Sequence, residues 1–510
     1  MKKKIKVFFI YLGVIILSLL MTAFVCAAFL FFYREGNIFG IKYIKRDEVM
    51  YLRSGDVADT LNIKSINIAT DGFDIRVEPN KACVDVDAAM VNKSYGYVHK
   101  SKANASFTLK FDNETGALVF NVVEPDGWIS KKNCYIVIAI PESLLDACID
   151  IEAKSEKGDI SIGGKEQLCT NNIVIQSEKG DSSLINLSVD GTLDFDIGSG
   201  LVFVDERCVG QDVDVNISLG SGKVNMTRIG DLDIGTVEVD KIKSGTIGIL
   251  KAFELVTERD IRGGGRIDVG EVKVLEISTL DTNVKVGTLG VIGSESSLPS
   301  RIDISGNGDI EILRAYSNLQ ISGHNGNVKI EKVTGDISLT TNQGDVEIYN
   351  AYKNVAIDTQ YGTAKICFSD DAPQYYAGGR VLVAGTKNGH IISKGLQNAS
   401  VTVRDKGRVT LDYNAVRGMN LITADTIGSV DIVVPAKVNA SDNVAINLKV
   451  KSEIKPDIKV GTVSSLQAVI NNGEYILDVD NIYGTAGINT LKIETAAGNV
   501  KVRSRNLIDF

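Results

Sequence analysis

A short glycine-centred motif returns along most of this chain at nearly constant spacing. The pentapeptide SEKGD occurs at 155–159 and again, unchanged, at 177–181. Later copies keep the glycine and change its neighbours, as in TNQGDVEI at 341–348 and AAGNVKV at 496–502. A fixed period of about 20 residues is typical of solenoids, in which every repeat contributes one turn of a coil. The glycines that align the best copies are Gly158, Gly180, Gly200, Gly222, Gly308, Gly326, Gly344 and Gly362.

Each copy predicts two short strands. After Gly344, apolar Val346 and Ile348 alternate with charged residues, and a second alternating stretch follows at 355–359. Such short strands bury their apolar face only by stacking turn on turn, about 4.8 Å apart. We therefore expect an all-β fold, a parallel β-solenoid (β-helix) with turns of roughly 18–22 residues over 151–430. The glycine supplies a positive φ at the corner, and the Asp or Asn after it caps donors of that turn.

The regions on either side of the repeats carry longer alternating runs. Residues 61–150 include YIVIAIP at 135–141, and residues 431–510 include AINLKVK at 445–451 and the last repeat. Open ends of a solenoid expose unpaired strand edges, so both regions are predicted to be β caps. Residues 35–60 would form a juxtamembrane stalk.

The N-terminus predicts a membrane helix. Residues 7–33 contain no charged side chain, and an apolar run of this length is enough to cross a bilayer. A secretory signal is the rival, but its apolar region is shorter, and a lipoprotein would need a small residue where Val25 precedes Cys26. Lysines at positions 2, 3, 4 and 6 favour a cytoplasmic N-terminus. We expect residues 1–34 to be a cytoplasmic tip and single-pass plasma-membrane anchor, with residues 7–33 in the lipid bilayer and the rest extracytoplasmic.

Charge and cysteine content exclude several classes of protein. Beyond residue 34, 50 basic residues face 64 acidic ones, which argues against a nucleic-acid partner. The six cysteines outside the helix are scattered, without a CxxC pair, so a zinc site or a dense disulfide scaffold is not expected. Buried thiols are favoured, and one bridge among Cys134, Cys148 and Cys169 stays open.

One segment resembles a known family. YIVIAIPESLLDACIDIEAKSEKGDISI at 135–162 is similar to the repeat entry of the putative-adhesin β-strand-repeat family of bacterial surface and envelope proteins, and SVDIVVPA at 429–436 resembles a second use of it. The resemblance implies a surface-exposed, non-enzymatic β-helix. It carries over no functional residue. Some relatives accompany envelope-stress systems, which keeps a regulatory function in view.

The sequence offers little for catalysis or cofactor binding. The three histidines (99, 324 and 390) share no motif, and GxSxG, HExxH and P-loop patterns are absent. We therefore expect no enzyme and no cofactor. GNGDIEI at 306–312 lacks the tandem nine-residue period of a calcium roll. Tyr375 and Tyr376 could contact a glycan, although a longer surface loop is the simpler explanation for them.

The one weak metal candidate is an acidic ladder. Its members are Asp194, Asp196, Asp212, Asp214, Asp231 and Asp233. If the strand that carries Asp194 stacked in register on the strand that carries Asp212, their carboxylates would line up about 5 Å apart and could bind calcium or a cationic polymer. Aligning on Gly200 and Gly222 instead shifts these pairs, and a solvated outer face is the alternative.

The first function hypothesis is an adhesin-like structural or binding module with a surface glycan or protein partner. The alternative is a cell-envelope stress or signalling accessory protein that contacts other membrane proteins. A polysaccharide lyase and a self-assembling scaffold like the bactofilins are less favoured, because no acid–base cluster repeats on neighbouring turns and bactofilins lack such a spanning helix.

Overall fold

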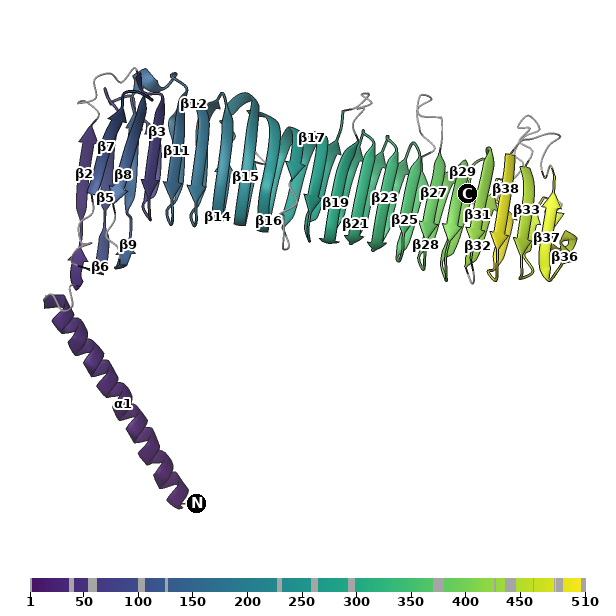
Figure 1. Cartoon of the computed structure of the whole chain (residues 1–510), viewed down its shortest axis with the longest axis horizontal. Helices are drawn as coiled ribbons and strands as arrows, with labels where there is room; N and C mark the ends of the chain where they lie inside the picture. Colours follow the sequence, from purple (N-terminus) through teal and green to yellow (C-terminus); the bar gives the residue numbers. More distant parts are fainter. Residues whose placement is uncertain are drawn as a thin grey trace. The chain divides into compact units, whose positions relative to one another are not determined.

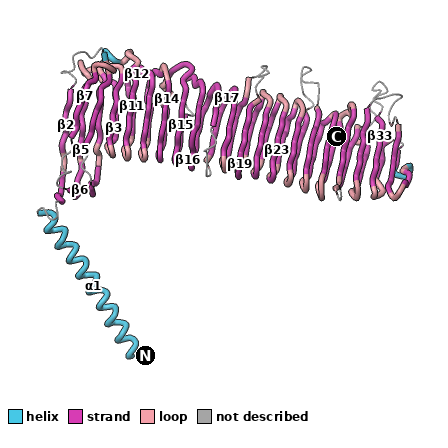
Figure 2. Tube along the Cα trace, in the orientation of Figure 1, coloured by secondary structure: helices cyan, strands magenta, loops and turns pink. Residues whose placement is uncertain are grey.

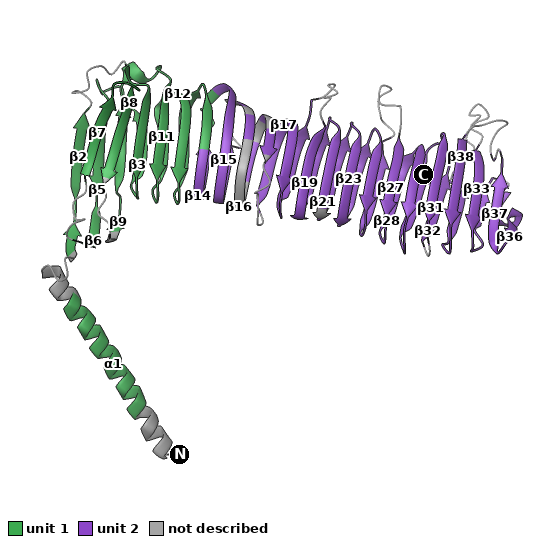
Figure 3. Cartoon of the chain, in the orientation of Figure 1, with its two compact units in different colours: residues 1–194, 205–209 green, residues 195–204, 210–510 purple. Residues whose placement is uncertain are grey.

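The chain divides into two compact units. The computed structural model describes residues 2–35, 41–53, 62–99, 106–123, 127–226, 232–257, 265–291, 299–369, 380–425, 428–435, 446–461, 463–480, 482 and 489–505. Unit 1 comprises residues 1–194 and 205–209, and unit 2 comprises residues 195–204 and 210–510 (Figure 3). The protein is mostly β, with one long N-terminal helix (Figure 2).

The helix α1 (Lys2–Glu35) matches the predicted apolar segment. Its stretch Ile10–Phe29 is long and apolar enough to cross a membrane and is buried by no other part of the described chain. A membrane anchor and a signal sequence share these properties.

The described strands of unit 1 begin with an antiparallel region and continue into parallel pairing. They are β1 (Ile41–Lys45), β2 (Glu48–Arg53), β3 (Ser65–Thr70), β4 (Asp74–Pro79), β5 (Asp87–Asn92), β6 (Ser94–His99), β7 (Ser106–Asp112), β8 (Ala117–Val123), β9 (Gly127–Lys131), β10 (Tyr135–Ile140), β11 (Ile149–Ser155), β12 (Ile160–Ser177) and β13 (Ser182–Val189). Strand β14 (Thr192–Val204) has residues in both units.

Unit 2 contains the most regular turns (Figure 1). Its strands are β15 (Val209–Met226), β16 (Leu232–Thr257), β17 (Arg266–Thr279), β18 (Asn283–Leu289), β19 (Ser300–Asn307), β20 (Ile310–Ala315), β21 (Leu319–Asn325), β22 (Val328–Val333), β23 (Ile337–Gln343), β24 (Val346–Ala351), β25 (Val355–Thr359), β26 (Thr363–Phe368), β27 (Val381–Thr386), β28 (His390–Leu396), β29 (Asn398–Val403), β30 (Arg408–Tyr413), β31 (Met419–Ala424), β32 (Ser429–Val434), β33 (Ile446–Ser452), β34 (Asp457–Val460), β35 (Val463–Ser464), β36 (Val469–Asn471), β37 (Glu474–Val479), β38 (Asn489–Thr495) and β39 (Val500–Ser504).

From β18 to β32, strands two apart in sequence pair in parallel. Strand β20 pairs with β22 and β22 with β24, while β19 pairs with β21 and β21 with β23. Partners in the middle of the unit are one sequence repeat apart, as with Ile330 and Ile348. The result is a solenoid-like coil with two strands per turn, which form two parallel faces.

Aliphatic columns hold the turns together. Ile312, Ile330, Ile348 and Ile366 occupy successive register positions on one face, and each is at most 1% exposed. Burying one such side chain contributes about 2–3 kcal/mol before entropy is considered. The apolar residues of the alternation predicted from the sequence are thus the side chains that form the core of the coil.

The N-terminal turn of unit 1 lies inside the stack. Strand β3 pairs in parallel with both β8 and β11, and β4 pairs in parallel with both β10 and β12. Antiparallel strands then follow on the outer side, where β10 pairs with β5 and β8 with β7. The parallel stack therefore includes residues 65–79, inside the region predicted as cap, and does not begin at residue 151.

The C-terminal turn of unit 2 is also inserted out of sequence order. Strand β38 lies between β31 and β33 and is parallel to both, and β39 lies between β32 and β34. Beyond β33, antiparallel β37 and β36 cover the end of that face. The last described residues of the chain thus fill a place between two turns that precede them in sequence.

One disulfide is present among the described residues. Cys148 and Cys169 are bonded near the start of β11, and Cys134 and Cys208 are buried thiols. Of the three cysteines among which the sequence left a bridge open, Cys148 and Cys169 form the bond.

Candidate binding groove at the glycine corner

The repeat glycines lie where successive turns approach each other most closely. A Cβ on Gly326 would collide with the carbonyl oxygen of Gly308, and one on Gly344 with that of Gly326. A collision with a neighbouring backbone carbonyl recurs for Gly158, Gly180, Gly222, Gly308 and Gly362, each against the turn before it.

Positive φ explains only some of these glycines. It occurs at Gly200, Gly222, Gly326, Gly344 and Gly362, and not at Gly158, Gly180 or Gly308. Close backbone approach is therefore the more general reason for glycine at the corner.

Where Asp309, Asn327 or Asp345 follows the glycine, it caps the next turn, and not its own turn as predicted. The backbone N–H of Asn327 donates to Oδ1 of Asp309 (2.8 Å), that of Asp345 to Asn327 (3.0 Å), and that of Thr363 to Asp345 (2.7 Å). In unit 1, Asp159 accepts from the N–H of Asp181 in the same way (2.8 Å). The aspartates of the two SEKGD copies thus join consecutive turns.

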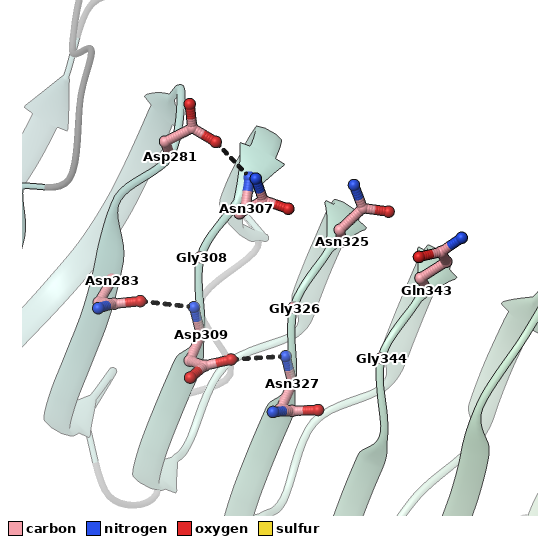
Figure 4. Close-up of a pocket in the computed structure, with 10 residues that line it drawn as sticks. All are labelled: Asp281, Asn283, Asn307, Gly308, Asp309, Asn325, Gly326, Asn327, Gln343 and Gly344. Carbon is pink, nitrogen blue, oxygen red and sulfur yellow. Dashed lines mark hydrogen bonds between the residues drawn. The ribbon is translucent and has the colours of Figure 1, made fainter.

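An open groove of about 580 Å³ runs over this corner in unit 2 (Figure 4). Its floor is the backbone of Gly308, Gly326 and Gly344. Because these residues have no side chain, the backbone is accessible between two rows of polar side chains. One row is Asn307, Asn325 and Gln343, the other is Asn283, Asp309 and Asn327, and Asp281 lies at the end.

The first row is an amide ladder, by which we mean Asn307, Asn325 and Gln343. The register places Asn307 beside Asn325 and Asn325 beside Gln343, so the side chains repeat at about 4.8 Å. Within the described chain their amide groups make no hydrogen bond. Each amide offers two donors and one acceptor oxygen, so the ladder presents a repeating polar pattern to solvent.

The second row is chemically different because its oxygens are already used. Oδ1 of Asn283 accepts the N–H of Asp309 (2.8 Å), and Oδ1 of Asp309 accepts the N–H of Asn327. These side chains are held in place by the coil. Asp281, whose Oδ1 accepts the N–H of Asn307 (2.6 Å), is held similarly at the end of the groove.

The groove carries a weak negative charge and no acid–base machinery. Asp281 and Asp309 are the only ionisable residues among the described side chains that line it. Among the described residues, no nucleophile and no histidine lines it. Among the described residues of the whole chain, no group of three or more His, Cys, Asp or Glu is arranged to hold a metal ion.

The structure does not stack Asp196 on Asp214. Gly220 stacks on Gly198 and Gly222 on Gly200, so the register of these turns follows the glycine pairs. This register places Asp196 beside Ser218, whereas the ladder required Asp196 beside Asp214.

In the register, Asp212 and Asp233 lie between the same two pairs, Gly210–Leu232 and Val213–Ile234. Asp214 has another role. Its Oδ1 accepts the backbone N–H of Thr236 (3.0 Å), so it serves as another cap between turns. Asp194 and Asp212 face partly or fully outward, Asp231 lies outside the described residues, and the side chain of Asp233 is not described.

The other candidate residues are not brought together. Tyr375 and Tyr376 lie outside the described residues, as does the side chain of His324. His99 is exposed on β6 in unit 1, and Nε2 of His390 in unit 2 contacts Oγ1 of Thr410 (3.0 Å). Burial lowers the pKa of His390, which favours the neutral ring.

Sequence reasoning missed the amide ladder and a second row of caps. Asn318 accepts from the N–H of Asp336 (2.9 Å), and Asp336 from that of Asn354 (3.0 Å), at another corner of each turn. The signal was present, because Asn or Gln precedes the glycine in three successive copies.

Comparison with known proteins gives a limited match. A crystal structure described as a putative cell adhesion protein from Clostridium sporogenes is 8% identical and covers 91% of this chain and 100% of its own, with a TM-score of 0.15. At this TM-score the likeness supports no comparison of residues. No curated protein matches the chain. Residues 63–247, which include both copies of SEKGD, match the family described as Toastrack DUF4097.

Proposed function

We propose that this chain is a membrane-anchored, extracytoplasmic binding module of the adhesin-like kind, and that it has no catalytic activity. The observation that carries the proposal is the amide ladder over a glycine floor. Its polar groups repeat with the turns and are not used by the fold. A site of this kind binds along its length and does not act on a single bond.

The chemistry of the groove favours a neutral, linear polymer with many hydroxyl groups. Amides donate to and accept from hydroxyls, and a repeat of about 4.8 Å is close to the length of one sugar unit in an extended chain. Asp281 and Asp309 disfavour an anionic polymer. A protein partner is less suited, because protein interfaces are centred on apolar and aromatic side chains and this groove has none.

Two further features support the proposed location. Helix α1 is suited to anchor the chain, with the lysines at its N-terminus in the cytoplasm. The Cys148–Cys169 disulfide is typical of proteins outside the reducing cytosol. Both agree with an extracytoplasmic C-terminal portion.

The test is binding of the detergent-solubilised full chain to an array of neutral, amine-bearing and anionic polysaccharides. The variant is Asn325→Ala with Gln343→Ala, which removes two amides of the ladder without touching the coil's own hydrogen bonds. The matched control is Gln320→Ala, an exposed residue of the same strand as Asn325. Each lost hydrogen bond costs about 1 kcal/mol, so we expect the double variant to bind about 30-fold more weakly and the control to bind normally.

Four outcomes would contradict the proposal. Equal binding by the double variant and the wild type would remove the groove from the site. Preference for anionic polymers would contradict its charge. If no polysaccharide binds, and other envelope membrane proteins are retained instead, the accessory-protein hypothesis replaces this one; turnover of any bound polymer would refute the absence of catalysis.

A further inference from the structure

Unit 1 contains a small sheet separate from the solenoid-like coil. Strands β1, β6 and β9 pair antiparallel, in the order β1-β6-β9. In the register, Tyr43 lies opposite Tyr97 and Lys45 opposite Tyr95. Residues directly opposite each other in an antiparallel pair project from the same face. One face of this sheet therefore carries Tyr43, Lys45, Tyr95 and Tyr97, and by the same register also His99 and Ser130; we call it the tyrosine face.

The two faces of the sheet differ in burial. Ile44 and Val98 project from the opposite face and are 7% and 1% exposed. On the tyrosine face, Tyr95 is 48% exposed and Lys45 is exposed. The rings of Tyr43 and Tyr97 pack edge to face, with centroids 5.2 Å apart. Tyr43 and Tyr97 are half-buried, so the face is an ordered aromatic surface that is partly exposed.

The side chains on this face suit the boundary between lipid and water. Tyrosine has an apolar ring and a polar hydroxyl, and it is enriched where membrane proteins cross the headgroup layer. Lysine places its charge near lipid phosphates while its stem covers apolar surface. Three tyrosines and one lysine on a single small sheet match this composition.

The covalent chain keeps the sheet close to the end of the helix. The uncharged run ends at Tyr33, and Arg34 is the first charged residue after it. Strand β1 begins at Ile41. Seven residue steps span at most about 25 Å even when fully extended. If α1 crosses a membrane, β1 therefore cannot lie far from the surface of that membrane.

We propose that the tyrosine face rests in the phospholipid headgroup layer of the membrane that α1 crosses. The occupant of this surface is thus lipid. The contact fixes the orientation of unit 1 with respect to the membrane, beyond the tethering that the helix alone provides. The proposal depends on the anchoring part of the proposed function and is independent of the groove.

The chain provides its own probe for this contact. Its only tryptophan, Trp128, belongs to β9, and its backbone pairs with that of Tyr97. Because α1 has no tryptophan, fluorescence reports from this sheet alone. The experiment reconstitutes the full chain in phosphatidylcholine nanodiscs, with or without lipids that carry a nitroxide quencher on the headgroup. We expect strong quenching of wild-type fluorescence.

The variant is Tyr43→Ser with Tyr95→Ser, and the matched control is Tyr361→Ser, a tyrosine of unit 2 that is 40% exposed. We expect the double variant to lose most of the quenching and the control to keep it. Melting temperatures establish that the variants are folded, and the single variant Tyr95→Ser replaces the double variant if the latter does not fold.

Alkaline carbonate extraction separates the two proposals. A chain that resists extraction but shows no quenching would overturn the lipid contact and leave the anchor intact. A chain that carbonate releases would overturn the anchor, and the lipid contact with it. Quenching that persists in the folded double variant would show that the tyrosines do not make the contact.

Discussion

Replacing a repeat glycine by alanine should destabilise the chain strongly where two turns approach each other closely. The same change elsewhere in the coil should have little effect. Gly344 has φ +128°, and a Cβ at this position would collide with the carbonyl oxygen of Gly326. Gly323, in the preceding turn, has no heavy atom within 4 Å of the position of an added Cβ and does not have a positive φ. Gly344→Ala and Gly323→Ala therefore make the same chemical change in very different surroundings.

The expected magnitude follows from two costs. Alanine in a backbone conformation that only glycine adopts readily costs about 1–3 kcal/mol. Separating two turns to admit a methyl group costs a further 1–3 kcal/mol or so by analogy with overpacked cores. The local hydrogen bond from the N–H of Gly326 to the carbonyl of Gln343 (2.9 Å) would also be strained. We expect Gly344→Ala to lower the free energy of unfolding by about 3–5 kcal/mol and Gly323→Ala to change it by less than about 1 kcal/mol.

The assay is urea unfolding of the full chain in detergent, combined with hydrogen exchange to locate the weakened turns. Stacked repeats contact mainly their neighbours, so faster exchange should centre on β22 to β26. Equal destabilisation by the two substitutions would refute the close-approach explanation for the repeat glycines.

Four other predictions follow from the described structure. Reduction of the Cys148–Cys169 disulfide, whose cysteines are separated by 21 residues in sequence, should cost about 3 kcal/mol, measured as a lower melting temperature; an unchanged melt would contradict this. Tyr413→Phe should stabilise the chain by about 1–3 kcal/mol, because the buried hydroxyl of Tyr413 has no hydrogen-bond partner among the described residues; a destabilised variant would argue for an internal water at this place. Deletion of residues 489–510 should remove hydrogen-exchange protection from β33 and β34 while β19 to β24 keep theirs, and uniform loss would point to a single cooperative unit. Millimolar calcium should leave the melting temperature unchanged, because no three acidic side chains converge among the described residues, and a clear rise would reveal a site.

The sequence predicted those features that are set within one turn. The spacing of Gly326, Gly344 and Gly362 indicated the repeat, and the alternation around Val346 and Ile348 indicated which side chains are buried. Both depend on local geometry. The glycine spacing follows from the close approach at the corner, and the alternation follows from the two-residue period of a strand. The uncharged run at 7–33 similarly predicted a long helix, because the run by itself matches the thickness of a bilayer.

Features set between turns could not be read from the sequence. Whether Asp345 caps its own turn or the next depends on how the turns stack, and the two alternative alignments place Asp196 beside different partners. The groove has the same origin, since Asn325 and Gln343 become neighbours only once the turns are stacked. The insertion of β38 between β31 and β33 joins strands from distant parts of the sequence, and no local pattern specifies it.

The out-of-order end of unit 2 has a consequence for biosynthesis. Strands β38 and β39 are the last described strands to be synthesised, yet they pair on both sides with strands made earlier. A chain that emerges from its N-terminus can stack β19 to β32 progressively, but β33 and β34 receive their parallel neighbours only after residue 504 has emerged. Closure of this end therefore requires that residues 489–504 have been synthesised. A chain truncated before residue 489 would keep unsatisfied strand edges, the feature by which quality-control proteases and chaperones distinguish unfinished proteins from finished ones.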